Sequence, residues 1–108
     1  MNNLNPTVWV TQEQPRFDYG PAAKFGDIVP ITIMDFAPID DSINNKVLIE
    51  ELRTKLRDFN PDTDYVVMSG SPAVAAAIFM LIREKTNVMR FLRWDNRTYS
   101  YAPIIINL

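Results

Sequence analysis

Apolar and polar positions follow patterns along the chain that predict five strands and two helices. An apolar spacing of three to four residues over 43–59 predicts an amphipathic helix, and residues 73–85 form a second helix that is apolar on almost every side. Residues 16–26 keep no period, so we expect a structured loop there. Five runs rich in β-branched and aromatic residues are typical of strands: 7–11, 27–33, 65–69, 88–94 and 99–106.

The start of the second helix is the most sharply marked boundary. Gly70 suits a turn, Ser71 is a good N-cap, and Pro72 fits the first helical position, where its missing N–H is no loss. Pro30 cannot donate a ladder hydrogen bond, which places the strand 27–33 at an edge of the sheet or at a bulge.

These elements predict a single domain over residues 1–108, in which an N-terminal strand and structured loop (1–26) precede an α/β core (27–108). The last strand adds antiparallel through a hairpin. The expected fold is a small Rossmann-like α/β domain with a three-stranded parallel core sheet, an antiparallel C-terminal hairpin strand and two helices. Two right-handed crossovers make three strands parallel neighbours: 28–33, 65–69 and 88–94.

One candidate ligand site follows from this topology. Loops after parallel strands leave the sheet at the same end, where open α/β folds bind ligands. The N–H groups that open the second helix are suited to an anion, which indicates a small nucleotide- or phosphate-binding domain, or a hydrolase of such a ligand. Neither the dinucleotide fingerprint nor the phosphate-binding loop motif is present, and Ser71 suits a cap better than a nucleophile. The candidate residues are Asp35, Ser69, Gly70, Ser71 and Asp95.

Composition restricts the chemistry further. The 108 residues include no histidine and no cysteine, which removes disulfides, thiolate and imidazole metal ligands, and the commonest general base near neutral pH. The carboxylates of Asp35, Asp40 and Asp41 offer oxygen ligands for Mg²⁺, but loop solvation and helix capping explain them more simply. We therefore expect no metal, no cofactor and no catalytic residue, which favours a non-enzymatic protein.

Charge is divided unevenly, and this draws attention to the C-terminal hairpin. Residues 1–64 carry eleven acidic and six basic side chains, whereas residues 65–108 carry two acidic and five basic ones. Arginine, tryptophan and tyrosine together are typical of protein-binding hot spots, and they also suit an RNA-stacking platform. The acidic first half disfavours nucleic acid, so a protein partner is preferred; the alternative is that the tryptophan and the arginine stems only cover the core edge. The candidate partner-binding residues are Arg90, Arg93, Trp94, Arg97 and Tyr99.

Nothing in the sequence indicates export or a membrane. Residues 1–6 lack the basic and apolar regions of a signal peptide, and the longest apolar run, 73–82, is far shorter than the roughly 20 residues that span a bilayer. We expect a cytoplasmic protein without a membrane partner. The edge strand 99–106 leaves a homodimer open.

Six segments spread over residues 16–108 share a recognisable pattern: Phe17-Asp-Tyr19, Ala23-Lys-Phe-Gly-Asp-Ile28, Leu52 to Phe59, Asp64 to Pro72, Leu92-Arg-Trp-Asp95 and Tyr101-Ala-Pro-Ile104. They resemble a family of small proteins of unknown function from T7-related tailed bacteriophages, podoviruses of aquatic bacteria. The resemblance implies a phage protein made in the cytoplasm of an infected bacterial host. It implies no activity, and by analogy with other small phage proteins it favours one that binds a host or phage protein. A minor virion or assembly component is a further alternative.

Overall fold

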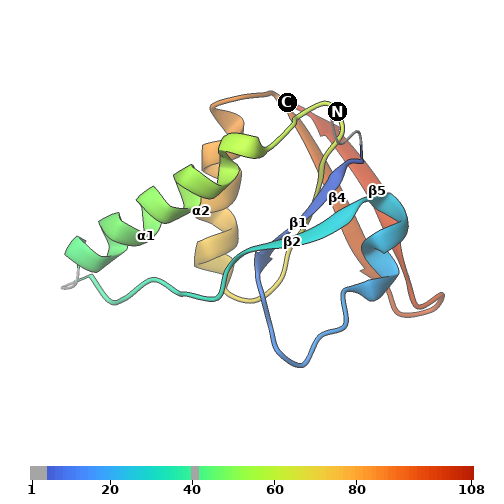
Figure 1. The fold of residues 1–108 in the computed structure, drawn as a ribbon, viewed down its shortest axis with the longest axis horizontal. Helices are drawn as coiled ribbons and strands as arrows, with labels where there is room; N and C mark the ends of the chain where they lie inside the picture. The colour runs from blue at the N-terminus through green and yellow to red at the C-terminus, as the bar shows by residue number, and fades with distance from the viewer. Residues whose placement is uncertain (1–4, 40–41) are drawn as a thin grey trace.

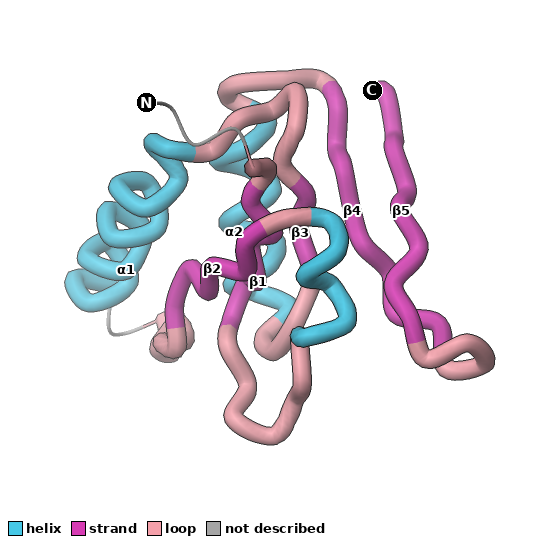
Figure 2. Tube along the Cα trace, turned by 45° about the vertical axis from the view of Figure 1, so that its right-hand side comes forward, coloured by secondary structure: helices cyan, strands magenta, loops and turns pink. Residues whose placement is uncertain are grey.

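The computed structural model describes residues 5–39 and 42–108 of the chain. Its strands form one mixed sheet in the order β2-β1-β3-β4-β5 (Figure 1; β3 is labelled in Figure 2). The strands are β1 (Thr7–Gln12), β2 (Asp27–Thr32), β3 (Tyr65–Val67), β4 (Val88–Asp95) and β5 (Ser100–Asn107). The helices are α1 (Ser42–Lys55) and α2 (Pro72–Arg83), with the short 3₁₀ helices η1 (Gly20–Phe25) and η2 (Leu56–Asp58).

The parallel part of the sheet has four strands, so the predicted three-stranded parallel core is wrong. β1 lies between β2 and β3 and pairs parallel with both, which separates two strands that were predicted as neighbours. β3 pairs parallel with β4, and β5 adds antiparallel, as predicted. The cause lies in β1 itself: Val8, Trp9 and Val10 are all buried, and a strand with apolar residues on both faces needs the cover that only a central position provides.

The two faces of the sheet are covered unequally (Figure 1). Both α-helices pack on one face, over a core that includes Trp9, Leu52 and Ile78. The opposite face is covered by η1 and the loop before it, where Ala22 is buried against a second cluster with Val8. The loop predicted at residues 16–26 is thus largely a 3₁₀ helix that closes one face of the core.

The first helix is only partly buried. Leu48 and Leu52 face the core, whereas Ile43 and Val47, which were predicted on the same buried face, are exposed because the first turns of α1 extend beyond the sheet (Figure 1). The capping candidates Asp40 and Asp41 lie outside the described residues. Within the part of the chain that the structure describes, no helix is long and apolar enough to cross a membrane.

A buried carboxylate fixes β1 against β3. Asp64 accepts hydrogen bonds from Thr7 N (2.9 Å), from Trp9 Nε1 (3.0 Å) and from Asn60 N (2.9 Å), and its side chain also accepts one from Thr63 Oγ1 (3.1 Å). Four donors therefore share one carboxylate at the amino ends of the central strands. This arrangement sets the register of β1 and β3, and with it the arrangement of the residues at their carboxyl ends.

Candidate functional site

A ligand site was predicted at the carboxyl ends of the parallel strands, and in the structure the 69–71 turn lies there beside the crevice between β1 and β3. The chain leaves β1 toward the η1 face and leaves β3 toward the α2 face, and open α/β sheets bind ligands at such a reversal. Here the crevice is filled by Gln12, whose Oε1 accepts from Ser71 N (2.7 Å) and from Gln14 Nε2 (3.0 Å). Gln12 Nε2 donates to Met34 O (2.9 Å). The Ser71 N–H that would bind an anion therefore already has an acceptor.

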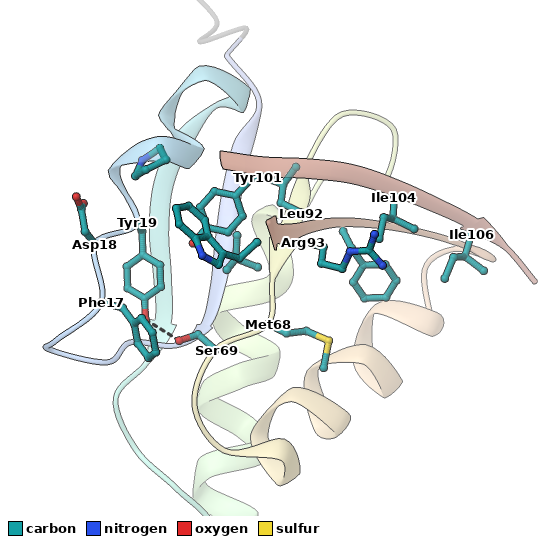
Figure 3. A pocket seen from close by; sticks show the side chains of 14 residues that line it. Phe17, Asp18, Tyr19, Met68, Ser69, Leu92, Arg93, Tyr101, Ile104 and Ile106 are labelled. Carbon is teal, nitrogen blue, oxygen red and sulfur yellow. Dashed lines mark hydrogen bonds between the residues drawn. The ribbon is translucent and has the colours of Figure 1, made fainter. Parts of the chain in front are cut away.

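Ser69 is engaged in the same way. Its N–H donates to Thr11 Oγ1 (2.8 Å), and that hydroxyl donates to Ser69 O (2.8 Å). Ser69 Oγ lies 2.6 Å from Tyr19 Oη, which also accepts from Gln14 N (3.0 Å) (Figure 3). The hydroxyl of Ser69 is thus part of a structural network, and no histidine exists in the chain to activate it.

Gly70 and the start of α2 follow the prediction from the sequence. Gly70 has φ +78°, and a Cβ there would lie 2.0 Å from Gln12 Oε1. Ser71 Oγ accepts from Val74 N at 3.5 Å, and Pro72 opens the helix. The glycine is needed for the turn and for the close approach of Gln12, which explains it without a ligand.

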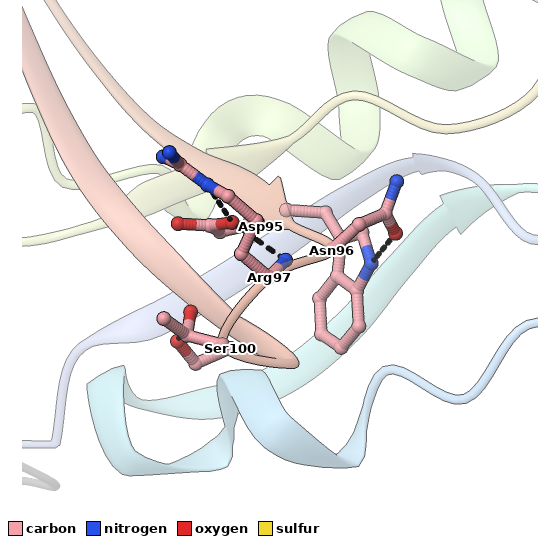
Figure 4. Close-up of polar contacts among 6 residues, drawn as sticks. Asp95, Asn96, Arg97 and Ser100 are labelled. Atoms are coloured by element: carbon pink, nitrogen blue, oxygen red, sulfur yellow. Dashed lines mark hydrogen bonds and ion pairs between the residues drawn. The ribbon is translucent and has the colours of Figure 1, made fainter.

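The two carboxylates predicted at this end bond within their own loops. Asp35 Oδ1 accepts from Phe36 N (2.7 Å), and Asp95 Oδ1 accepts from Arg97 N (2.8 Å) and Arg97 Nε (3.4 Å) (Figure 4). The hydrogen bond from the Arg97 backbone lowers the pKa of Asp95. Among the described residues, no hydrogen bond joins either carboxylate to the 69–71 turn, so the predicted set does not converge on one polar centre.

Beside the filled crevice lies an open groove of about 610 Å³ (Figure 3). It exists because β3 is short: Val67 pairs with Leu92, and β4 then continues to Asp95 with no β3 residue beside it. The space past the end of β3 is bounded by three segments, which are the loop before η1, the residues after β3 and the β4–β5 hairpin. Among the lining residues are Phe17, Tyr19, Met68, Trp94, Tyr101 and Ile104.

The groove is mostly apolar, with a few polar groups at its margin. Arg93 lines it, is exposed, and forms no hydrogen bond or ion pair with any described residue. Asp18 also lines it, and its Oδ1 accepts from Gly20 N (2.8 Å). Burial, helped by the charges of Tyr19 and Asp18, raises the pKa of the Tyr101 phenol. One free cation therefore stands beside a largely apolar surface.

The residues predicted to bind a partner separate into two groups. Arg93 and Trp94 line the groove, and Tyr99 packs near Trp94 with ring centroids 6.4 Å apart. Arg90 instead lies over the ring of Tyr65 at 4.5 Å and is turned toward the body of the domain. Arg97 stays with Asp95 at the hairpin tip.

Sequence reasoning missed two exposed apolar residues of the groove. Phe17 lies in the segment that was predicted as a structured loop and Met68 in the predicted strand 65–69, and both are exposed and line the groove. Met68 is exposed because β3 ends one residue earlier, at Val67.

A family model matches nearly the whole chain. The family model described as Phage Pam3 gp32-like protein matches residues 6–108, a span that includes every strand and helix. No curated protein and no solved structure matches significantly. In the described residues, no cluster of three or more acidic side chains is placed to hold a metal ion. The predicted phage affiliation is confirmed, while the T7-related origin stays a prediction. The chain belongs to the Phage Pam3 gp32-like protein family.

Proposed function

We propose that this phage-family protein is a non-enzymatic binding protein that holds a partner protein, from the host or the phage, in the groove beside Trp94. The groove itself carries the proposal. Its volume of about 610 Å³ and its apolar, aromatic lining fall in the range typical of binding sites, and apolar surface left open to water supports a role in contact.

The polar groups of the groove suit recognition better than catalysis. The hydroxyls of Tyr19 and Ser69 bond to each other, and the Asp18 carboxylate accepts from a backbone N–H. Arg93 is different, because its guanidinium has no partner among the described residues. A free arginine at the margin of an apolar groove favours a partner segment with an acidic residue next to apolar ones.

The alternative, nucleotide or phosphate binding at the 69–72 turn, has less support. The Ser71 N–H is bonded to Gln12 Oε1, and Pro72 has no N–H to offer. An anion would have to displace Gln12 from a buried position where three of its hydrogen bonds are made. An assembly role in the phage particle is compatible with the proposal if the partner is a structural protein.

Site-specific photo-crosslinking in infected cells tests the proposal. Benzoylphenylalanine replaces Phe17 or Met68 in the groove and, as a control, Met80, which is exposed on α2 outside the groove. We expect the same defined protein to be crosslinked from Phe17 and Met68, to be absent from Met80, and to be reduced by Arg93→Glu. Products that are equal from all three positions, or absent from the groove positions, would contradict the proposal.

A thermal-shift titration with nucleotides and inorganic phosphate tests the alternative. We expect no stabilisation at millimolar concentration. Ligand-dependent stabilisation would instead support the alternative, and its persistence in Met68→Gln would exclude the groove as the site, because Met68 lines the groove and its side chain makes no hydrogen bond to Gln12.

A further inference from the structure

Within residues 5–39 and 42–108, no strand lies beside the outer edge of β5 (Figure 2). Its sequence from Ser100 to Asn107 contains no charged residue and ends in three successive isoleucines before Asn107. Proteins usually protect a free edge with charged side chains, proline, bulges or a covering segment. Of these devices β5 has only Pro103, so the edge beyond that residue is open to pairing.

The hydrogen-bond pattern of the hairpin shows which backbone groups face outward. Leu108 N donates to Asn87 O (2.9 Å), and the register pairs Val88 with Asn107. Because hydrogen-bonded and non-bonded pairs alternate in an antiparallel ladder, the odd-numbered residues of β5 direct their N–H and C=O groups away from β4. Pro103 occupies one of these outward positions, where its missing N–H costs the hairpin nothing.

Both faces of this edge are apolar. Ile104 and Ile106 lie on the α2 side with Phe91 and Met89, their partners on β4, whereas Ile105 points to the opposite face. Ile105 is 51% exposed and Ile106 is 43% exposed. The open backbone groups of Ile105 and Asn107 are thus flanked by apolar side chains above and below the sheet.

We propose that β5 pairs antiparallel with β5 of a second copy of this chain, in a twofold dimer centred on Ile105. The argument is self-complementarity. A twofold axis at Ile105 places Ile104 opposite Ile106 of the second copy, and Ile105 opposite itself, so that every facing pair in the triplet is apolar and no like charges meet. A strand with this symmetry about one residue fits its own copy in the same way on both sides.

The backbone supports the same register. Ile105 and its counterpart, both with outward-facing groups, exchange two N–H···O=C bonds. Pro103 O accepts from Asn107 N of the second copy, and the twofold axis generates the same bond from Asn107 N to Pro103 O of the second copy. Pro103 has no N–H to donate in return, so the ladder between the two copies ends at this residue. The contact is short, so we expect a dimer that dissociates on dilution. This inference does not rest on the proposed function of the groove.

Sedimentation velocity of the full chain over a range of concentrations tests the dimer. We expect the mass to rise from monomer to dimer, and Ile105→Lys, which sets like charges across the axis, to weaken association at least about tenfold. Pro103→Ala restores an outward N–H and should tighten association. If the two copies associated through side chains alone, this substitution would not change the affinity. Ile105 N does not bond to β4, so Ile105→Pro should keep the fold and remain monomeric.

Two outcomes would overturn the proposal. One is a monomer at all concentrations up to about 1 mM, where a dimer with a dissociation constant of about 1 mM is detected. The other is a dimer that is unchanged by Ile105→Lys, Ile105→Pro and Pro103→Ala, which would place the interface elsewhere. Circular dichroism of each variant establishes that the fold is retained. The groove proposal is tested by photo-crosslinking from position 17 and not by sedimentation, so absence of the dimer would not contradict it.

Discussion

The crevice between β1 and β3 and the groove past the end of β3 are neighbours at the carboxyl ends of the parallel strands, but they differ in polarity and in whether the chain fills them. The crevice between β1 and β3 is polar and filled by Gln12, which bonds to Ser71 N, Gln14 Nε2 and Met34 O. The groove past the end of β3 is mostly apolar and open, with Met68 and Trp94 exposed along it. In the crevice the chain satisfies its own polar groups, whereas in the groove it leaves apolar surface uncovered.

The difference arises from strand length. β1 reaches Gln12, whose side chain is long enough to fill the crevice it borders. β3 is three residues long and β4 is eight, so residues 93–95 of β4 have no neighbour on that side. A position typical of ligand sites is therefore a structural centre here, and the proposed contact surface lies one strand farther along the sheet.

The largest effect is expected from Gly70→Ala in the crevice. The residue has φ +78°, which strains any side chain, and its Cβ would lie 2.0 Å from Gln12 Oε1 and 2.7 Å from Gln14 Nε2. Displacing Gln12 also breaks its bond to Ser71 N. We expect a loss of about 2–4 kcal/mol in the free energy of unfolding, measured by urea denaturation.

The matched control for this variant is Gly20→Ala. A Cβ at Gly20 meets only the side chain of Asp18, at 2.9 Å, and the backbone there has no positive φ. We expect a change of less than about 1 kcal/mol. Equal losses at Gly20 and Gly70 would contradict the role given to the crevice.

A smaller loss is expected from Gln12→Ala. Removing this side chain leaves Ser71 N without its acceptor at the start of α2 and Met34 O without its donor. An unsatisfied buried polar group costs about 1–3 kcal/mol, and water entering the space recovers part of that. We expect a net loss of about 1–3 kcal/mol, with no loss of partner crosslinking from Phe17. Loss of crosslinking in a folded variant would link the crevice to function.

The sequence predicted those features that depend on neighbouring residues. Gly70, Ser71 and Pro72 mark the start of α2, and Pro30 places β2 at an edge, because caps and proline act locally. The position of β1 could not be predicted in the same way. A short apolar run is equally suited to an edge or a centre until its partners are known.

The site was predictable only in part, for a related reason. Gln12 is held in the crevice by hydrogen bonds to Met34 and Ser71, which lie 22 and 59 residues away in the chain. Nothing in the residues next to Gln12 in the sequence indicates these contacts. Trp94 and Arg93 were identified from the composition of the hairpin, and both line the groove. The groove itself results from unequal strand lengths, which fall within the error of any boundary assigned from sequence.

We expect Tyr101, which packs where the groove meets the core, to contribute to the fall in the free energy of unfolding at alkaline pH. Burial raises the pKa of the Tyr101 phenol in the folded state, and the charges of Tyr19 and Asp18 raise it further. The unfolded chain ionises near the ordinary value of about 10, so stability falls as pH rises above that value toward the folded pKa. We expect Tyr101→Phe to flatten this fall in urea unfolding between about pH 8 and pH 11. Identical slopes in both proteins would contradict the prediction.

The smallest change in stability is expected from Met68→Lys in the groove. The same substitution should strongly reduce the binding of an apolar dye to the groove. Met68 is 59% exposed, so the free energy of unfolding should shift by no more than about 0.5 kcal/mol. An uncharged apolar dye such as Nile red should bind the open groove of the wild-type protein, and a lysine there should lower its fluorescence severalfold. Met80→Lys, at an exposed site on α2 outside the groove, should leave the dye signal unchanged. If both lysines lower the signal equally, the groove is not distinct from the rest of the apolar surface. If only Met68→Lys does, the apolar surface that takes up the dye is the groove past the end of β3, where the proposal places the partner.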